Sequence, residues 1–163
     1  MKKYPIAPDL KIKAVTIIDF PVFYKKMKLW LQDNGFAKEE TLEKKYIERI
    51  KLNGKQLEIQ WEGKKSKSDF FDYYIGVTFL ILGMKDVEVQ QGSITRKMNQ
   101  GDFEVRINSY IQTTENLDKL GTLKRIYMNM LIKKRIEEYK IDLYDKVYKF
   151  HNYVKELLSL RSY

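Results

Sequence analysis

An eleven-residue apolar run, Tyr73–Gly83 (YYIGVTFLILG), constrains this chain more than any other stretch. It is rich in β-branched and aromatic residues, with Asp69 and Asp72 before it and Lys85 and Asp86 after it. A run of this length and composition favours a strand that is buried on both faces. It is too short to cross a bilayer as a helix. Because two apolar faces need two covers, we expect helices to pack against this strand.

A first strand and an amphipathic helix are predicted before this run. Residues 10–18 alternate imperfectly and end in β-branched residues, which indicates a strand, and the two prolines before it indicate an extended lead-in. Asp19 has the side chain and position of a helix N-cap, and Gly35 those of a helix stop. The apolar residues that recur between them at helical spacing are Phe20, Phe23, Met27, Trp30 and Leu31.

The dipeptide Asn53-Gly54 lies between two alternating runs and predicts a hairpin with a two-residue type I′ turn. The register that follows has one mostly apolar, buried face and one outer face of matched charges. The predicted pairs are Tyr46–Trp61, Glu48–Ile59 and Ile50–Leu57 on the buried face, and Lys45–Glu62 and Arg49–Glu58 on the outer face. Glu58 and Glu62 are thereby explained as ion-pair partners rather than as a catalytic acid and base.

The segments after the central run complete an antiparallel meander of five or six strands. Alternation predicts strands at residues 87–90, 94–98 and 103–111, and turn-forming residues predict turns at 91–93 and 99–102. Gly76 inside the central strand indicates a close approach by another element, for which a helix lying across the sheet is the candidate.

A long helix is predicted at the C-terminal end of the chain. No Gly or Pro interrupts residues 123–158, where apolar residues recur mostly at steps of three and four. Unbroken, this helix would be roughly 54 Å long, so it either bends near residues 139–142 or projects beyond the sheet. Its apolar stripe either packs across the sheet, which is the commoner arrangement, or forms a self-association seam.

These elements predict an α+β fold: an antiparallel meander packed against one amphipathic N-terminal helix and the long C-terminal helix. The length of 163 residues favours a single domain, 1–163, with the strand-helix-meander part at 10–113 and the helix at 122–158. The element order resembles the helix-grip arrangement of START-like and Bet v 1-like proteins, which usually have two short helices after the first strand. That resemblance implies a cavity for an apolar ligand. Residues 83–110 and the segment LKRIYMNMLIKKRIEEY also look like small uncharacterised archaeal α+β proteins, which implies no activity.

Several kinds of chemistry are excluded or disfavoured by the residues present. Cysteine is absent, which excludes disulfides, thiolate metal sites and a Cys nucleophile, and His151 is the one histidine. The glycines are scattered singly, without a phosphate-binding loop, and no catalytic motif occurs. We therefore expect no enzyme, cofactor or metal site. Since we recognise neither a leader nor an apolar run long enough to span a membrane, we expect a cytoplasmic protein.

Charge distribution carries the functional prediction. The net charge is +9: residues 1–60 contribute +5, residues 61–115 contribute −1 and residues 116–163 contribute +5. Basic ends favour polyanionic partners, either nucleic acid or anionic lipid headgroups. The competing explanation is that an AT-rich genome would encode a Lys-rich surface with no partner.

We predict a non-catalytic binding protein that docks on a polyanion, RNA or DNA, through two basic groups. Two alternatives stay open: a helix-grip carrier of an apolar small molecule, and an assembly module that associates through the C-terminal helix. The predicted polyanion-binding residues are Lys64, Lys65 and Lys67 in the connection 63–68, and Lys124, Arg125, Lys133, Lys134 and Arg135 on the C-terminal helix.

Overall fold

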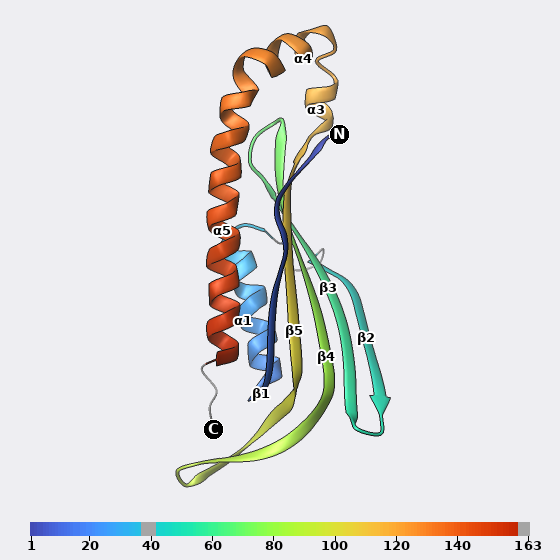
Figure 1. Ribbon diagram of the computed structural model, residues 1–163, viewed down its shortest axis with the longest axis vertical. Helices are drawn as coiled ribbons and strands as arrows, with labels where there is room; N and C mark the ends of the chain where they lie inside the picture. The colour runs from blue at the N-terminus through green and yellow to red at the C-terminus, as the bar shows by residue number, and fades with distance from the viewer. Residues whose placement is uncertain (37–41, 160–163) are drawn as a thin grey trace.

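The computed structural model describes residues 1–36 and 42–159. A five-stranded antiparallel sheet carries helices on one face, which confirms the predicted α+β class (Figure 1). The strand order is β1-β5-β4-β3-β2. The elements are β1 (Lys3–Ile18), α1 (Phe20–Asp33), β2 (Glu43–Lys51), β3 (Gly54–Ser66), β4 (Phe71–Gln91), β5 (Ile94–Thr113), α3 (Glu115–Asp118), α4 (Thr122–Tyr127), the π-helical segment η1 (Met128–Ile132) and α5 (Lys133–Ser159).

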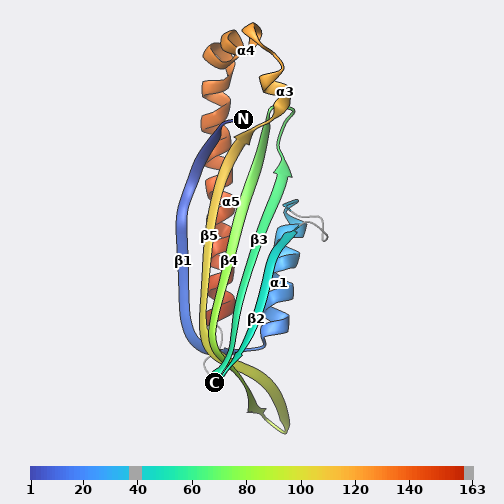
Figure 2. The ribbon, with the colours of Figure 1, turned by 90° about the vertical axis from the view of Figure 1, so that its right-hand side faces the viewer.

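The core lies between the sheet and two helices. Helix α5 runs along the side of the sheet formed by β1, β5 and β4, and α1 lies beside it behind β3 and β2 (Figure 2). Leu143, Val147, Phe150 and Val154 of α5 are fully buried, as the helical spacing predicts. Trp30 of α1 is half-buried and packs on Phe150 with ring centroids 4.8 Å apart. The apolar stripe of α5 is therefore occupied within the molecule, which leaves a self-association seam along it without support.

The central run is the middle of β4, but it is buried on one face only. Its odd-numbered side chains, from Tyr73 to Ile81, face the helices and are at most 1% exposed. Tyr74, Thr78 and Leu80 point to the other face and are partly exposed. The prediction of two buried faces was therefore wrong, because both packed helices lie on the same side of the sheet (Figure 1). The close approach expected at Gly76 comes from the Asn108 side chain on β5 rather than from a helix.

Strand β1 is longer than predicted and begins at Lys3, so the proline-containing lead-in belongs to the sheet. Pro5 and Pro8 are tolerated because β1 is an edge strand, and its pairing with β5 shifts between Pro5 and Leu10. Asp19 caps α1 as predicted, since its carboxylate accepts a hydrogen bond from the backbone N–H of Val22 at 3.4 Å.

The β2–β3 hairpin turns one residue earlier than predicted. Lys51 pairs with Gly54, and Tyr46 pairs with Ile59 instead of Trp61. Each partner moves by two residues, so every side chain keeps its predicted face. Trp61 is buried as predicted, whereas Tyr46 and Ile50 are exposed, because β2 is an edge strand that makes few contacts with the helices.

Strands β4 and β5 run without a break through residues that were predicted as separate strands. The predicted turn at 99–102 lies inside β5, opposite residues 82–86 of β4. Gly83, with φ of 63°, begins a shift in the pairing, and Gly101 lets the displaced Met84 backbone approach closely. The β4–β5 hairpin extends beyond the other strands (Figure 1). The sheet therefore has five strands, the lower of the two predicted numbers.

The C-terminal helix is continuous through residues 139–142, where a bend was one of the two predicted outcomes. Its irregularity lies in η1, and there the chain curves over the end of the sheet into α4 (Figure 1). A π-helical turn is a recognised cause of such a bend, because it inserts a residue into the hydrogen-bond ladder.

Candidate docking surface

The eight predicted polyanion-binding residues fall into two groups with different surroundings. Lys64 and Lys65 were predicted to lie in a loop, but they are consecutive residues of β3. Their side chains therefore point to opposite faces of the sheet. The structure does not bring them together with the five cations of the C-terminal helix into one surface.

The three lysines of the first group, Lys64, Lys65 and Lys67, each have a partner within the molecule. Lys64 Nζ lies 3.2 Å from Asp72 Oδ2, and this hydrogen bond raises the lysine pKa. Lys65 Nζ donates to the carbonyl of Asn34 at 3.0 Å, and burial lowers its pKa. A polyanion would have to compete with these contacts, so this group is a poor candidate for the site.

Lys67 belongs to a cluster around Asp142 of α5 that joins the helix layer to the sheet. Asp142 accepts hydrogen bonds from Lys146 at 2.6 Å, Tyr73 at 2.9 Å and Lys67 at 3.2 Å. Burial opposes ionisation of Asp142, but these three donors outweigh it and lower its pKa to about 2. Burial and the neighbouring carboxylate raise the pKa of Tyr73 well above its ordinary value. Lys67 therefore has a structural role.

The second group of cations lies at one end of the elongated molecule, in residues 119–136, which we call the apical segment (Figure 1). This segment contains six Lys or Arg residues and no Asp or Glu. Lys124 pairs with Asp118 at 2.5 Å, and Asp118 also lies 3.3 Å from the N-terminal amino group. The other four predicted cations are exposed, and their side chains have no ion pair or hydrogen bond within residues 1–36 and 42–159. They are Arg125, Lys133, Lys134 and Arg135.

An apolar groove of about 520 Å³ lies on the same apical segment, between α4, η1 and Phe70, the residue directly before β4. At its base Phe70 meets Tyr127 edge to face, with ring centroids 5.3 Å apart. The residues that line it are Phe70, Leu120, Leu123, Ile126, Tyr127, Met130 and Leu131. The apical segment therefore combines unpaired positive charge with an apolar surface.

Sequence reasoning missed this groove because it assigned Ile126 and Met130 to the buried stripe of one continuous helix. A signal was present in the spacing. Ile126 and Met130 are four residues apart, and Ile132 and Ile136 are four apart, but the step from Met130 to Ile132 is only two. Two residues apart on a helix do not face the same side, so the segment holds two stripes of different phase. In the structure Ile132 and Ile136 are buried, and Met130 is exposed.

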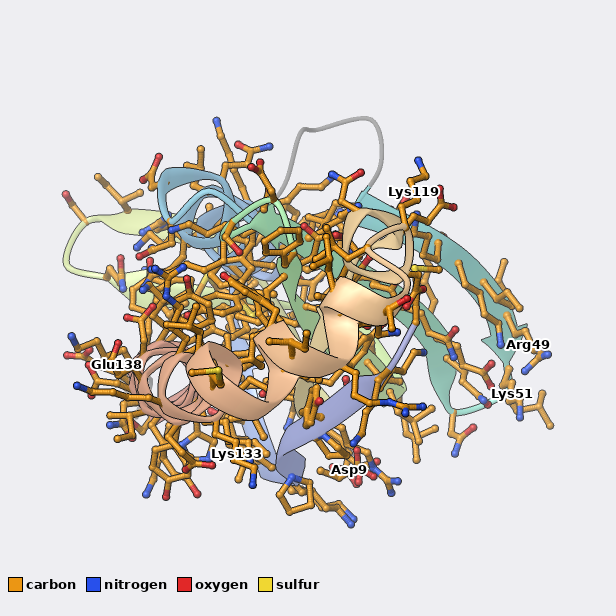
Figure 3. The ribbon with its side chains drawn as sticks, turned by 90° about the horizontal axis from the view of Figure 1, so that it is seen from above. Asp9, Arg49, Lys51, Lys119, Lys133 and Glu138 are labelled. Carbon is orange, nitrogen blue, oxygen red and sulfur yellow. The ribbon has the colours of Figure 1, made fainter. Side chains whose placement is uncertain are left out.

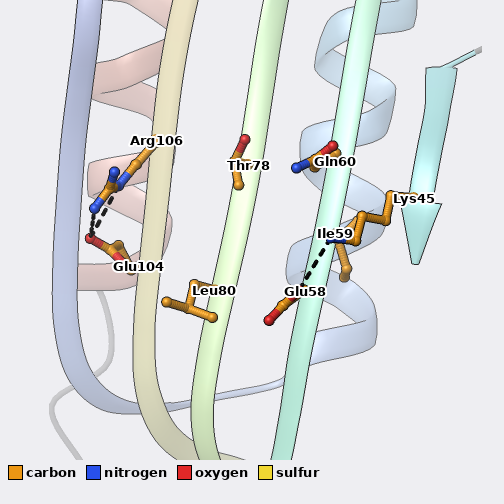
Figure 4. A pocket seen from close by; sticks show the side chains of 8 residues that line it. All are labelled: Lys45, Glu58, Ile59, Gln60, Thr78, Leu80, Glu104 and Arg106. Atoms are coloured by element: carbon orange, nitrogen blue, oxygen red, sulfur yellow. Dashed lines mark hydrogen bonds and ion pairs between the residues drawn. The ribbon is translucent and has the colours of Figure 1, made fainter. Parts of the chain in front are cut away.

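The open face of the sheet is a second surface with many charges, and four of its cations are paired with carboxylates: Lys11, Lys45, Arg49 and Arg106. Glu104 lies 3.0 Å from Lys11 and 3.3 Å from Arg106, and hydrogen bonds from these cations lower its pKa. Glu58 pairs with Arg49 as predicted, at 3.1 Å, but Lys45 joins the same Glu58 rather than Glu62. A depression of about 280 Å³ lies between these two clusters (Figure 4).

Two tyrosines on this open face stack on each other instead of presenting free rings. Tyr74 and Tyr110 are nearly parallel, with centroids 4.7 Å apart, and Lys64 and Lys3 lie over them, 5.9 and 4.6 Å from the respective centroids. Burial, followed by the charge of Glu62, raises the pKa of Tyr110 to about 12. This arrangement favours a structural role over a base-stacking platform.

The described part of the chain has neither a metal-ligand cluster nor a membrane-spanning helix. Within residues 1–36 and 42–159, no three potential ligands among His, Asp and Glu gather into a metal site. None of the helices there is both long enough and apolar enough to cross a membrane. Comparison with known proteins leaves the helix-grip and archaeal resemblances as predictions: no family model, no curated protein and no solved structure matches this chain.

Proposed function

We propose that this chain is a non-catalytic binding protein that docks on a phosphate-bearing polyanion through its apical segment. One observation carries the proposal: Arg125, Lys133, Lys134 and Arg135 are exposed and unpaired in the described structure, in a segment without acidic residues. By contrast, carboxylates pair with Lys64 and Lys67 near the end of β3 and with Lys11 and Arg106 on the open face. Unpaired cations close together attract phosphates, because binding releases the counterions that phosphates hold.

Salt dependence of RNA binding tests the charge part of this proposal. Affinity for a generic single-stranded RNA should fall linearly with log salt, by roughly 0.7 per phosphate contact, or about 0.9 for duplex DNA. A triple variant with Gln in place of Lys133, Lys134 and Arg135 should bind more weakly whatever the RNA sequence. The slope of log affinity against log salt should become shallower by about 0.7 for each lost contact on RNA, or about 0.9 on duplex DNA. Fluorescence anisotropy over a salt series measures both quantities.

A matched control removes the same charge elsewhere. Lys25, Lys26 and Lys44 are exposed on α1 and β2, away from the apical segment, and their replacement with Gln should leave the slope unchanged. Equal losses in the two triple variants would mean that net charge alone drives binding and would contradict the proposed site. Absence of binding to every phosphate polyanion at low salt would contradict the function itself.

The apical groove favours a second candidate function, a carrier of an apolar small molecule. Its volume of about 520 Å³ and its apolar lining suit a small ligand. The helix-grip resemblance implied a cavity under the last helix, where Leu143, Val147 and Phe150 pack into the core. Native mass spectrometry of protein purified from its own host tests this alternative, because a carrier should retain a bound apolar molecule. The Met130→Trp variant puts a bulkier side chain in the groove and should no longer retain that molecule.

A further inference from the structure

The apical segment exposes more large apolar side chains than a surface contact with phosphates requires. Leu123 is 67% exposed, Ile126 57%, Met130 79% and Leu131 53%. Met1 is also exposed, and its amino group is held beside Asp118 at the same end of the molecule. Contiguous exposed apolar side chains with a polar rim mark a surface that is covered in use.

The charges around this patch limit what can cover it. Lys119 and Lys124 are paired with Glu115 and Asp118 of α3, but Arg125, Lys133, Lys134 and Arg135 are not paired within the described residues. A second copy of the chain would bring the same four unpaired cations against the first, so like-charge repulsion disfavours self-association. Nucleic acid would satisfy the cations but would leave Leu123, Ile126 and Met130 without an apolar partner. Tyr127 is packed against Phe70, so it is not free to stack on a base.

We propose that the apical segment docks on the surface of an anionic lipid bilayer. Ile126, Met130 and their apolar neighbours enter the boundary between headgroups and acyl chains, while Arg125, Lys133, Lys134 and Arg135 bind lipid phosphates. Interfacial helices bind in this way, through buried apolar area together with attraction to anionic lipid. The inference rests on the proposed function and specifies the polyanion.

The shape of the molecule suits an end-on contact with a flat surface. The apical helices stand foremost when the molecule is viewed along its long axis, and Lys119 and Lys133 lie on opposite sides of them (Figure 3). Lys119 is paired with Glu115 at 4.0 Å, whereas Lys133 has no ion pair within the described residues, so a free basic side chain lies beside the apical helices (Figure 3). The β2–β3 turn lies toward the other end (Figure 1), so its exposed Ile50 and Leu52 offer a matched control.

Vesicle flotation at about 150 mM salt, where surface charges act over only about 8 Å, tests this inference. The chain should bind vesicles of phosphatidylcholine with phosphatidylserine and should not bind phosphatidylcholine alone. Ile126→Ser combined with Met130→Ser should reduce the partition coefficient about tenfold or more, because apolar insertion and charge are both needed for stable binding. The control variant, Ile50→Ser combined with Leu52→Ser, removes two exposed apolar side chains at the β2–β3 turn. Its vesicle partition coefficient should differ from that of the unchanged protein by less than about twofold.

RNA binding at low salt separates failure of this inference from failure of the proposed function. The Ile126→Ser, Met130→Ser variant should keep RNA binding, whereas replacing Lys133, Lys134 and Arg135 with Gln should weaken binding to both RNA and vesicles. If the apolar variant binds vesicles as well as the unchanged protein does, the membrane inference is overturned and the polyanion function stands. RNA binding without vesicle binding would likewise overturn it and assign the segment to nucleic acid.

A labelled side chain gives a direct readout of insertion. Because the chain has no cysteine, Met130→Cys can carry a single environment-sensitive fluorophore, with Leu52→Cys as the control. The emission of the Met130→Cys label should shift to the blue on anionic vesicles, and that of the Leu52→Cys label should not. A shift that accompanies dimer formation in the absence of vesicles would assign the groove to a second copy and overturn the proposal.

Discussion

At the scale of single residues, two buried hydroxyl groups on β5 differ in whether they have a partner. Thr113 Oγ1 accepts a hydrogen bond from the backbone N–H of Lys2 at 2.7 Å, and this contact fastens the start of β1 to β5. Ser109 is 2% exposed, and its Oγ has no hydrogen-bond partner among the described residues. A buried polar atom without a partner destabilises the fold. Removing the two hydroxyls should therefore change the free energy of unfolding in opposite directions.

Replacing Ser109 with Ala should raise the free energy of unfolding by about 0.5–1 kcal/mol, because an unpaired hydroxyl is removed from the core. Replacing Thr113 with Ala should lower it by about 1 kcal/mol, because the Lys2 N–H loses its acceptor. Urea denaturation measures both changes. A loss of stability in Ser109→Ala would show that its hydroxyl does have a partner, such as a bound water.

At the scale of elements, a contact between two glycines decides the register of the β2–β3 hairpin. Gly54 has φ of 123°, and a Cβ added there would lie 2.7 Å from the carbonyl carbon of Gly83 on β4. Only a residue without a side chain fits at this point, so Gly54 starts β3 instead of serving as the second turn residue. Local turn preference predicted the other register, and contact with β4 accounts for the difference.

Gly54→Ala should therefore lower the free energy of unfolding by about 2 kcal/mol or more, because an unfavourable φ is combined with a clash against backbone. Gly92→Ala is the matched control. Gly92 also has a positive φ, 62°, but nothing lies within 4 Å of an added Cβ, so the loss should be about 1 kcal/mol. Equal losses in urea melts would show that backbone conformation, not contact with β4, limits position 54.

At the scale of the whole molecule, apolar packing and one polar cluster join the helix layer to the sheet. The cluster centres on Asp142 of α5, which accepts hydrogen bonds from Tyr73 of β4 and from Lys67 in the segment after β3. Because its pKa is about 2 in the folded protein, below the ordinary 3.8, ionised Asp142 stabilises the fold. That contribution is complete above the unfolded-state pKa and is lost as the pH falls through the folded-state value.

Asp142→Asn should lower the free energy of unfolding by about 1 kcal/mol at pH 7. The loss is kept this small because the carboxylate is partly exposed and solvent screens its interactions. The difference from the unchanged protein should shrink as the pH falls from 4 to 2. Asp145→Asn is the control, since Asp145 is exposed and its one ion pair within the described residues is with Lys149, one turn along the helix, at 3.1 Å. Thermal melts across that pH range check the result, and a difference that persists at pH 2 would contradict it.

Much of the fold could be predicted because its signals are local. Asp19 caps a helix whose apolar spacing is visible in the chain, the odd-numbered positions of β4 alternate with even-numbered ones, and residues 122–159 lack helix breakers. The concentration of cations in the apical segment was likewise visible in the sequence. Such features depend on neighbours within a few residues, so they need no knowledge of the tertiary structure.

Tertiary structure alone decided which side chains are covered and which cations are free. Lys67 looked like a surface cation, but its partner Asp142 is 75 residues away in the sequence. Ile126 and Met130 looked like core, but the π-helical turn rotates the helix face, and the sheet ends before it could cover them. Burial and pairing depend on what lies opposite in space. The sequence by itself therefore determined the elements and their charge, and only packing decided that the apical segment carries the exposed apolar surface.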